Sequence, residues 1–369
     1  MPPRTAPPFR ADHVGSLLRT RSLKEARARH EKGGVSAVEL KAIEDREIAA
    51  AIKKQEEIGL RAVTDGEFRR AFWNYDFLGA LPGVEAYLGE RKIKFQGVNP
   101  KPMMLRVTGK LGTLTAHPML DHFKFVREHA KATPKMTIPS PSVMHFRGGR
   151  QAIDKKAYPE MGAYFDDLAK LYGKAIKAFY DAGCRYLQLD DTVWAYLCSR
   201  EQLDQARARG EDADKLAGIY AKTINTALKS KPADMTITTH VCRGNFRSTW
   251  ISEGGYEPVA DLLLGGVDYD GFFLEYDTER AGGFEPLRFV PKGNKQIVLG
   301  LVTSKSGTLE KKDDIKKRID EASKYVAHEQ LCLSPQCGFA STEEGNVLTE
   351  QAQWNKMKMI REISQEVWG

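Results

Sequence analysis

Long amphipathic stretches alternate with short apolar runs along most of the chain. One amphipathic stretch begins at Ser36, which forms a capping-box pattern with Glu39, and its apolar residues keep helical spacing as far as Gly59. The apolar run LRAVTD follows directly at residues 60–65. The same order recurs at 161–190, where RYLQLD follows an amphipathic stretch that ends in DAG. This order predicts helices that alternate with strands, as in an α/β protein.

Eight apolar runs have the length of buried strands. They are DHVGSLL (12–18), LRAVTD (60–65), KMTIPS (135–140), RYLQLD (185–190), MTITTHV (235–241), GFFLEYD (271–277), QIVLGLV (296–302) and QLCLSPQ (330–336). Most intervals between them have room for one helix and its loops, so the pattern predicts a single (β/α)8 TIM barrel domain over residues 1–369. A doubly wound open sheet would give the same alternation, because periodicity does not report closure of a sheet.

The longest interval between two of these runs spans residues 66–134. It contains FQGVNPKPMMLRVTGKLGTLTA, in which β-like segments surround Pro and Gly. We expect a β-hairpin-like insertion after the second strand there, and not a second domain.

Composition narrows the class of protein. The chain has 369 residues, of which 41% are hydrophobic and 28% charged, and the opening MPPRTAPPFR lacks the apolar core of a signal peptide. No window approaches the length of a membrane span, so we expect a soluble cytoplasmic protein without a membrane partner. Five cysteines are too few for a disulfide framework. The net charge is +7, but basic residues alternate with acidic ones, as in EKKDDIKKR, which argues against a nucleic-acid partner.

Polar residues cluster where the predicted strands end. In a (β/α)8 barrel the active site lies at the carboxyl ends of the strands. The residues at these ends are Ser16, Asp65, Glu67, Ser140, Ser142, Asp190, Asp191, His240, Cys242, Glu275, Asp277, Ser304, Lys305 and Cys337. An ordinary helix N-cap is the competing interpretation of Ser140, Asp191 and Asp277.

Four of these residues form a ligand set that suits zinc: His240, Cys242, Glu275 and Cys337. In an extended segment, residues two apart point the same way, so His240 and Cys242 of THVCRGNF could reach one ion. By themselves, a histidine and a cysteine in a strand are equally compatible with burial. The other three cysteines lie away from the strand ends or inside apolar runs and are not expected to be ligands: Cys184, Cys198 and Cys332.

An ordered set of motifs resembles the cobalamin-independent methionine synthases, in particular their zinc-bearing C-terminal barrel and the short single-barrel members. The motifs are HVGS, TDGEF, YLQLDD, THVCRGNF, GFFLEYD, VLGLVTSK and LCLSPQCGFAS, and together they cover nearly the whole chain. The resemblance implies Zn2+ as cofactor, with the same four ligands that the chemistry selects: His240, Cys242, Glu275 and Cys337.

The same resemblance implies how the substrate binds. The carboxylate of homocysteine would bind Ser16, and its ammonium group would lie near Glu67 and Asp190. Zinc would deprotonate the homocysteine thiol, which would attack an electrophilic methyl group to give methionine, with Glu275 as the ligand that the thiol displaces. The implied partners are homocysteine and a methyl donor, which is 5-methyltetrahydrofolate, a methylcorrinoid or another methylated compound, and a protein that delivers the methyl group is a further expectation.

The sequence departs from the family at the positions that the resemblance implies would act on the methyl donor. The histidine expected on the seventh predicted strand is replaced by Val302 or Thr303, and the acidic residue expected after Asp190 falls near Tyr196. The tryptophan that stacks on the pterin is absent from PSVMHFRGG. Residues that could substitute for these functions, or simply pack, are His13, His145, Trp73 and Trp194.

Two other functions compete with homocysteine methylation. One is a zinc-dependent thiol alkyltransferase of the epoxyalkane:coenzyme M transferase type, which would not need acidic residues for an ammonium group. The other is a barrel with structural zinc that serves binding or assembly, although structural sites are usually richer in cysteine.

Overall fold

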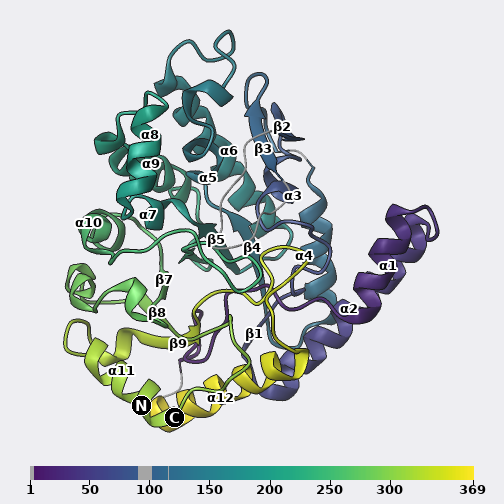
Figure 1. Ribbon diagram of the computed structural model, residues 1–369, viewed down its shortest axis with the longest axis vertical. Helices are drawn as coiled ribbons and strands as arrows, with labels where there is room; N and C mark the ends of the chain where they lie inside the picture. The colour runs from purple at the N-terminus through teal and green to yellow at the C-terminus, as the bar shows by residue number, and fades with distance from the viewer. Residues whose placement is uncertain (1–3, 90–101, 115) are drawn as a thin grey trace.

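A parallel β-sheet forms the centre of the molecule (Figure 1). The computed structural model describes residues 4–89, 102–114 and 116–369. Seven strands pair in the order β1-β4-β5-β6-β7-β8-β9, and every pairing is parallel. Their bounds are Ala62–Val63, Thr133–Pro139, Tyr186–Asp191, Thr236–Val241, Gly271–Glu275, Gln296–Val302 and Leu331–Pro335. All residues of β5, β7, β8 and β9 are buried, as expected for strands covered on both faces.

Helices connect and cover the strands. The α-helices are α1 (Arg21–Glu31), α2 (Ala37–Ile58), α3 (Tyr75–Leu78), α4 (Pro118–His129), α5 (Val143–Phe146), α6 (Met161–Asp181), α7 (Val193–Tyr196), α8 (Arg200–Ala208), α9 (Ala213–Leu228), α10 (Glu257–Ala260), α11 (Lys312–Ala322) and α12 (Glu350–Trp368). Short 3-10 or π segments are η1 (Gly149–Ala152), η2 (Asp261–Gly265), η3 (Glu279–Ala281), η4 (Glu285–Phe289) and η5 (His328–Gln330). Figure 1 shows α1 projecting from the body of the molecule. In the described ranges, no helix is both long and apolar enough to cross a bilayer.

The long helices begin and end where the sequence predicts. Ser36 and Glu39 form the complete capping box of α2, and Gly59 closes that helix with a φ of 88°. This left-handed conformation suits glycine because it has no Cβ. The strand β1 follows at once, so the predicted α–β alternation is confirmed in this segment.

The first predicted strand, residues 12–18, does not form a strand. The segment lies between β9 and β1: the Asp12 N–H donates to the Leu333 carbonyl at 3.0 Å, and the Leu17 N–H donates to the Gly66 carbonyl at 3.0 Å. Gly15 bends it with a φ of 143°. Its carbonyls at His13, Val14 and Gly15 accept hydrogen bonds from the side chains of Lys135, Gln188 and Thr64. Side chains therefore satisfy carbonyls that a strand would pair with a neighbour. The fold is α/β, with a seven-stranded parallel sheet that is consistent with a TIM-like barrel.

A second sheet lies in the predicted insertion. Strands β2 (Val84–Leu88) and β3 (Met103–Val107) pair antiparallel over five residue pairs. Part of the predicted hairpin sequence, residues 95–101 and 115, lies outside the described residues. The single β-hairpin therefore stays a prediction, as does closure into eight strands.

Candidate functional site

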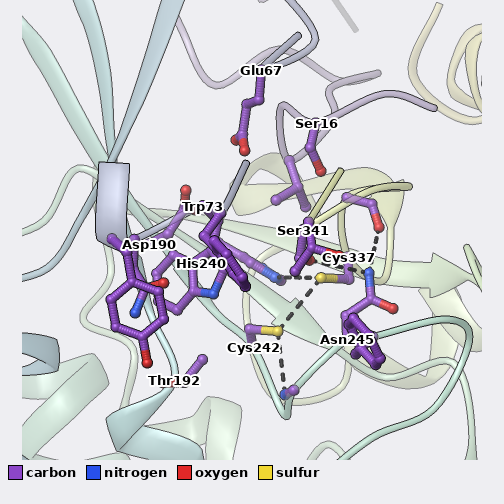
Figure 2. Close-up of a pocket in the computed structure, with 18 of the residues that line it drawn as sticks. Ser16, Glu67, Trp73, Asp190, Thr192, His240, Cys242, Asn245, Cys337 and Ser341 are labelled. Atoms are coloured by element: carbon purple, nitrogen blue, oxygen red, sulfur yellow. Dashed lines mark hydrogen bonds between the residues drawn. The ribbon is translucent and has the colours of Figure 1, made fainter. Parts of the chain in front are cut away.

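Side chains from several strand ends line one cavity, which we call the central cavity. Ser16 comes from the segment before α1, Glu67 from the turn after β1, and Asp190 from the end of β5. His240 is the second-last residue of β6, and Cys337 follows β9. Figure 2 shows Ser16 and Glu67 above the histidine and the two thiols. Residues far apart in sequence therefore meet at the carboxyl end of the sheet.

Four buried side chains in this region could hold a metal ion: His240, Cys242, Glu275 and Cys337. One ligand atom from each lies within 4.8 Å of the other three. The Cys337 Sγ lies 3.4 Å from His240 Nε2 and 3.5 Å from Cys242 Sγ (Figure 2). Tetrahedral zinc would place its ligands about 3.6 Å (N to S) and about 3.8 Å (S to S) apart. The donor atoms are therefore close to zinc-binding geometry.

Glu275 is held on both carboxylate oxygens. The Arg243 backbone N–H donates to Oε1 at 2.8 Å. Oε2 accepts from Gln336 at 3.3 Å and from Arg280 at 3.4 Å. Groups that orient a metal ligand in this way also tune its metal affinity.

Lys305 lies close enough to this group to affect its charge. Burial raises the pKa of Glu275, and the hydrogen bond to Cys337 raises that of Cys242; the positive charge of Lys305 opposes both shifts. It also adds to the effect of the Cys242 hydrogen bond, which lowers the pKa of Cys337. The Lys305 Nζ is buried and has no hydrogen-bond partner among the described residues. An ammonium group at this place would offset the negative charge that two thiolates and a carboxylate carry when they bind a metal ion.

The two thiols already differ in acidity. The hydrogen bond from Cys242 holds the pKa of Cys337 well below its usual value, and the same bond, with burial, raises the pKa of Cys242 well above it. Burial lowers the pKa of His240, but Cys337, Asp190 and Glu275 together outweigh burial, so the pKa of the imidazole is raised. The site thus stabilises a thiolate, the form of cysteine that binds metals.

The loop after β6 fixes the second thiol. Gly244 has a φ of 90°, and its N–H donates to Cys242 Sγ at 3.3 Å. A Cβ on this glycine would lie 2.9 Å from the side chain of Ile251. Glycine is therefore required here both by conformation and by space.

Glu67 occupies a strained position at the cavity wall. Its φ of 60° is unusual for a residue with a Cβ, and the adjacent Gly66 also has a positive φ. Oε1 accepts from Thr137 at 2.8 Å, whereas Oε2 is buried without a hydrogen-bond partner in the described chain. Burial raises the pKa of Glu67 against the opposing charge of Arg70. Such strain with an unsatisfied carboxylate is typical of a ligand-binding position.

Asp190 and Ser16 complete the polar wall. Burial, with a further contribution from the Glu67 carboxylate, raises the pKa of Asp190 to about 7. Ser16 Oγ accepts a hydrogen bond from the Ala340 N–H at 3.3 Å. A Cβ on Gly338 would lie 2.0 Å from this Oγ, so only glycine allows the close approach.

Several other predicted strand-end residues have local structural roles. Asp65 accepts from the Glu67 N–H, and Asp191 accepts from Ser142 and from the Val193 N–H at the start of α7. Asp277 pairs with Arg280, and Ser304 donates to Gln336. Asp191 thus stabilises the start of α7, but the N-cap residue of that helix is Thr192, so the N-cap interpretation of Asp191 is wrong. The Sγ atoms of Cys184, Cys198 and Cys332 each donate to a backbone carbonyl.

The four residues that could replace the family's missing donor-site residues divide into those that line a cavity and those that do not. Trp73 lines the central cavity. His13, His145 and Trp194 are buried and do not line either of the two cavities at this end of the sheet, as far as the described residues define them. His145 bonds the Tyr220 hydroxyl at 2.7 Å.

Several residues that line the central cavity were not predicted from the sequence, among them Thr192, Asn245 and Ser341. Asn245 donates to the Gly338 carbonyl at 2.7 Å and to Ser341 at 3.3 Å (Figure 2). Asn245 and Ser341 lie inside THVCRGNF and CGFAS, the motifs that contain the candidate metal ligands Cys242 and Cys337, so their position next to those cysteines was a usable signal.

A second cavity of about 270 Å³ adjoins the central one, and Asn74, Tyr75 and Arg147 line both. Three methionines contribute apolar surface to it: Met103, Met104 and Met144. Tyr196, which stands where an acid was expected, lines it and accepts a hydrogen bond from Arg147 at 2.6 Å. A second reactant could therefore reach the central cavity from this side.

Known proteins resemble this chain over almost its full length. Residues 9–360 match the family model described as cobalamin-independent synthase, catalytic domain. The uncharacterized protein YxjH of Bacillus subtilis is 54% identical over 362 residues, 98% of this chain and 95% of that protein. The methionine synthase of Sulfolobus acidocaldarius is 23% identical over 328 residues, 88% of this chain and 84% of that protein.

Solved structures agree with these matches. A candidate vitamin-B12-independent methionine synthase from Listeria monocytogenes has a TM-score of 0.81 at 43% identity, covering 99% of this chain and 100% of that chain. A B12-independent methionine synthase from Shewanella, solved with selenomethionine, shares the fold, with a TM-score of 0.69 at 18% identity and 96% of each chain covered. The chain belongs to the cobalamin-independent methionine synthase family.

Proposed function

We propose that this protein transfers a methyl group from a methylated donor to the thiol of homocysteine, which gives methionine. The observation that carries the proposal is one cavity that is lined by three of the four candidate metal ligands and by acidic groups suited to an amino acid. Zinc bound by His240, Cys242, Glu275 and Cys337 would lower the pKa of the substrate thiol, ordinarily about 8.5, so that it reacts as a thiolate at neutral pH.

The protein's own residues would bind and orient the amino-acid end. The unsatisfied Oε2 of Glu67 and the carboxylate of Asp190 line the same cavity and would accept hydrogen bonds from the ammonium group. Ser16 Oγ accepts from the Ala340 N–H, so its hydroxyl can donate to the substrate carboxylate. These contacts would fix the thiol end of the substrate toward His240 and the cysteines.

Glu275 is suited to give up its place among the ligands. Its carboxylate keeps hydrogen bonds from Arg243, Gln336 and Arg280, so it would remain satisfied if a substrate thiol replaced it. A structural site would instead be closed by four protein ligands and would not need a cavity beside it. The exchangeable carboxylate favours catalysis over a purely structural metal.

The acidic residues of the central cavity also distinguish homocysteine methylation from the alternative of a coenzyme M-type alkyltransferase. Coenzyme M carries a sulfonate and no ammonium group, so Glu67 and Asp190 would repel it. Calorimetric titration of the zinc-loaded protein with each thiol separates the two functions. We expect saturable binding of homocysteine; binding of coenzyme M with no binding of homocysteine would overturn the proposal.

Zinc K-edge X-ray absorption tests the metal part. Adding homocysteine should add one sulfur neighbour and remove one oxygen neighbour. An unchanged coordination shell with bound homocysteine would contradict direct thiol activation.

The second cavity is the proposed entrance for the methyl donor. A screen of methyltetrahydrofolate and methylcobalamin at fixed homocysteine concentration, scored by the methionine formed, identifies the class of donor.

A further inference from the structure

A cavity of about 260 Å³ lies at the end of the sheet opposite the proposed active site; we call it the arginine cavity. It is lined by residues that precede strands and by the ends of two helices. Arg10 and Arg61 come just before Ala11, which bridges to β9, and before β1. Gly59 closes α2, and Arg361 belongs to the last two turns of α12. Figure 1 shows α12 and both chain ends together on this side of the molecule.

Four guanidinium groups line this cavity: Arg4, Arg10, Arg61 and Arg361. None of them has a carboxylate within 4.0 Å in the part of the chain that the structure describes. Two helix C-termini contribute roughly half a negative charge each, and the α-carboxylate of Gly369, which also lines the cavity, contributes at most one more. A net positive charge from the four arginines therefore remains. Arg207, elsewhere on the molecule, is the contrasting case, because it forms ion pairs with two aspartates that balance its positive charge.

Neutral acceptors hold these arginines in place without cancelling their charge. Arg4 donates to the carbonyls of Pro7 and Pro8, and Arg61 donates to the Arg4 carbonyl. Arg10 donates to the carbonyls of Glu329 and Leu331, and Arg361 to that of Gly59. Fixed cations lose little entropy when a ligand arrives.

Aromatic rings add to this preorganisation. Arg61 stacks on Phe9 with 4.9 Å to the ring centre, and Arg10 stacks on Trp368 with 5.4 Å. The Arg10 Nε is buried and has no hydrogen-bond acceptor among the described residues. A buried N–H donor without a partner, next to clustered cations, is the complement of an anion's oxygen atoms.

We propose that the arginine cavity binds a small multivalent anion of the phosphate class, such as a diphosphate group. Guanidinium groups bind phosphate oxygens in bidentate fashion, and several of them around one cavity favour more than one negative charge. The cavity is smaller than those that enclose drug-sized ligands, which favours a compact anion or the phosphate end of a larger metabolite. This site is separate from the proposed active site and does not depend on the proposed function.

Isothermal titration of the zinc-loaded full chain with inorganic diphosphate, at constant ionic strength, tests this proposal. We expect saturable 1:1 binding, weaker binding of inorganic phosphate, and at least a tenfold loss of diphosphate affinity in the double variant Arg61→Gln/Arg361→Gln. The matched control is Arg207→Gln/Arg288→Gln, which removes two exposed arginines that have carboxylate partners. Diphosphate that merely extracts zinc would give the same heat in all three proteins.

Equal diphosphate binding by both double variants, or no saturable binding by the unaltered protein, would overturn the proposal. Thermal unfolding without anion checks that the Arg61→Gln/Arg361→Gln protein is folded. If it is not, the single substitution of the exposed Arg61 gives the same comparison, with a smaller expected loss of about threefold or more. Thiol binding should be unchanged in every variant, so failure here is distinguishable from failure of the proposed function.

Discussion

Cys337 Sγ lies 3.4 Å from His240 Nε2, although 97 positions separate the two residues along the chain. His240 lies near the carboxyl end of β6, and Cys337 lies just after the carboxyl end of β9. In the sheet, β7 and β8 lie between β6 and β9. The curvature of the sheet therefore brings the two donors together, and β7 supplies Glu275 between them.

Cys337→Ser should greatly reduce zinc affinity, because Cys337 is the thiolate that both His240 and Cys242 contact. Changing a group that only orients a ligand costs about 10- to 100-fold in affinity, so loss of the ligand should cost more. Zinc content after dialysis against a chelator measures the effect. Cys332→Ser is the matched control, since Cys332 is equally buried but away from the group. Full metal retention by Cys337→Ser would refute the ligand assignment.

Lys305→Met should make zinc binding more sensitive to acid. The charge of Lys305 favours the deprotonated forms of Glu275, Cys242 and Cys337, so its removal shifts their pKa values upward and protons compete better with the metal. Competition with a chelator between pH 6 and 9 should show a larger affinity loss at the acid end. The exposed Lys317→Met serves as control. Identical pH profiles for Lys305→Met and the unaltered protein would count against a role for this charge.

Methionine should bind more tightly at pH 8 than at pH 6. The pKa of Asp190 is raised to about 7 by burial and by Glu67, so below pH 7 the carboxyl is mostly protonated and cannot pair with the ammonium group. Affinity should fall by up to about tenfold per pH unit below 7. Methionine has no thiol proton, which isolates this effect. Asp190→Asn should bind weakly with a flatter profile; an unchanged slope would assign the titration to another group.

Gly338→Ala should impair binding of the amino acid while the protein stays folded. The new Cβ would lie 2.0 Å from Ser16 Oγ, so Ser16 must move out of the cavity wall. We expect the homocysteine dissociation constant to rise at least tenfold in titration calorimetry. Gly218→Ala in α9 is the control, because nothing lies within 4 Å of its added Cβ. In a helix interior that change should stabilise the protein by about 0.5–1 kcal/mol. Unaltered homocysteine affinity in Gly338→Ala would remove Ser16 from the substrate site.

Local patterns in the sequence determined the ends of the α2 helix, the positions of most strands and the candidate metal ligands of this protein. The capping box of Ser36 and Glu39 and the terminating Gly59 fix α2 because they act within a few residues. The short apolar runs identified seven of the strands, and the order of motifs placed His240, Cys242, Glu275 and Cys337 at their ends, where the structure brings them together.

Only the tertiary structure decided the rest, because it depends on contacts between residues distant in sequence. Residues 12–18 look like a strand, but the side chains of Lys135, Gln188 and Thr64 bind their carbonyls in place of a full ladder. The raised pKa of Asp190 likewise arises from burial beside Glu67, and the arginine cavity from helix ends and strand starts that meet at one end of the sheet. A hydrogen-bond partner or a neighbouring charge from another strand leaves no periodic signal in the sequence, so its identity is fixed only when the chain folds.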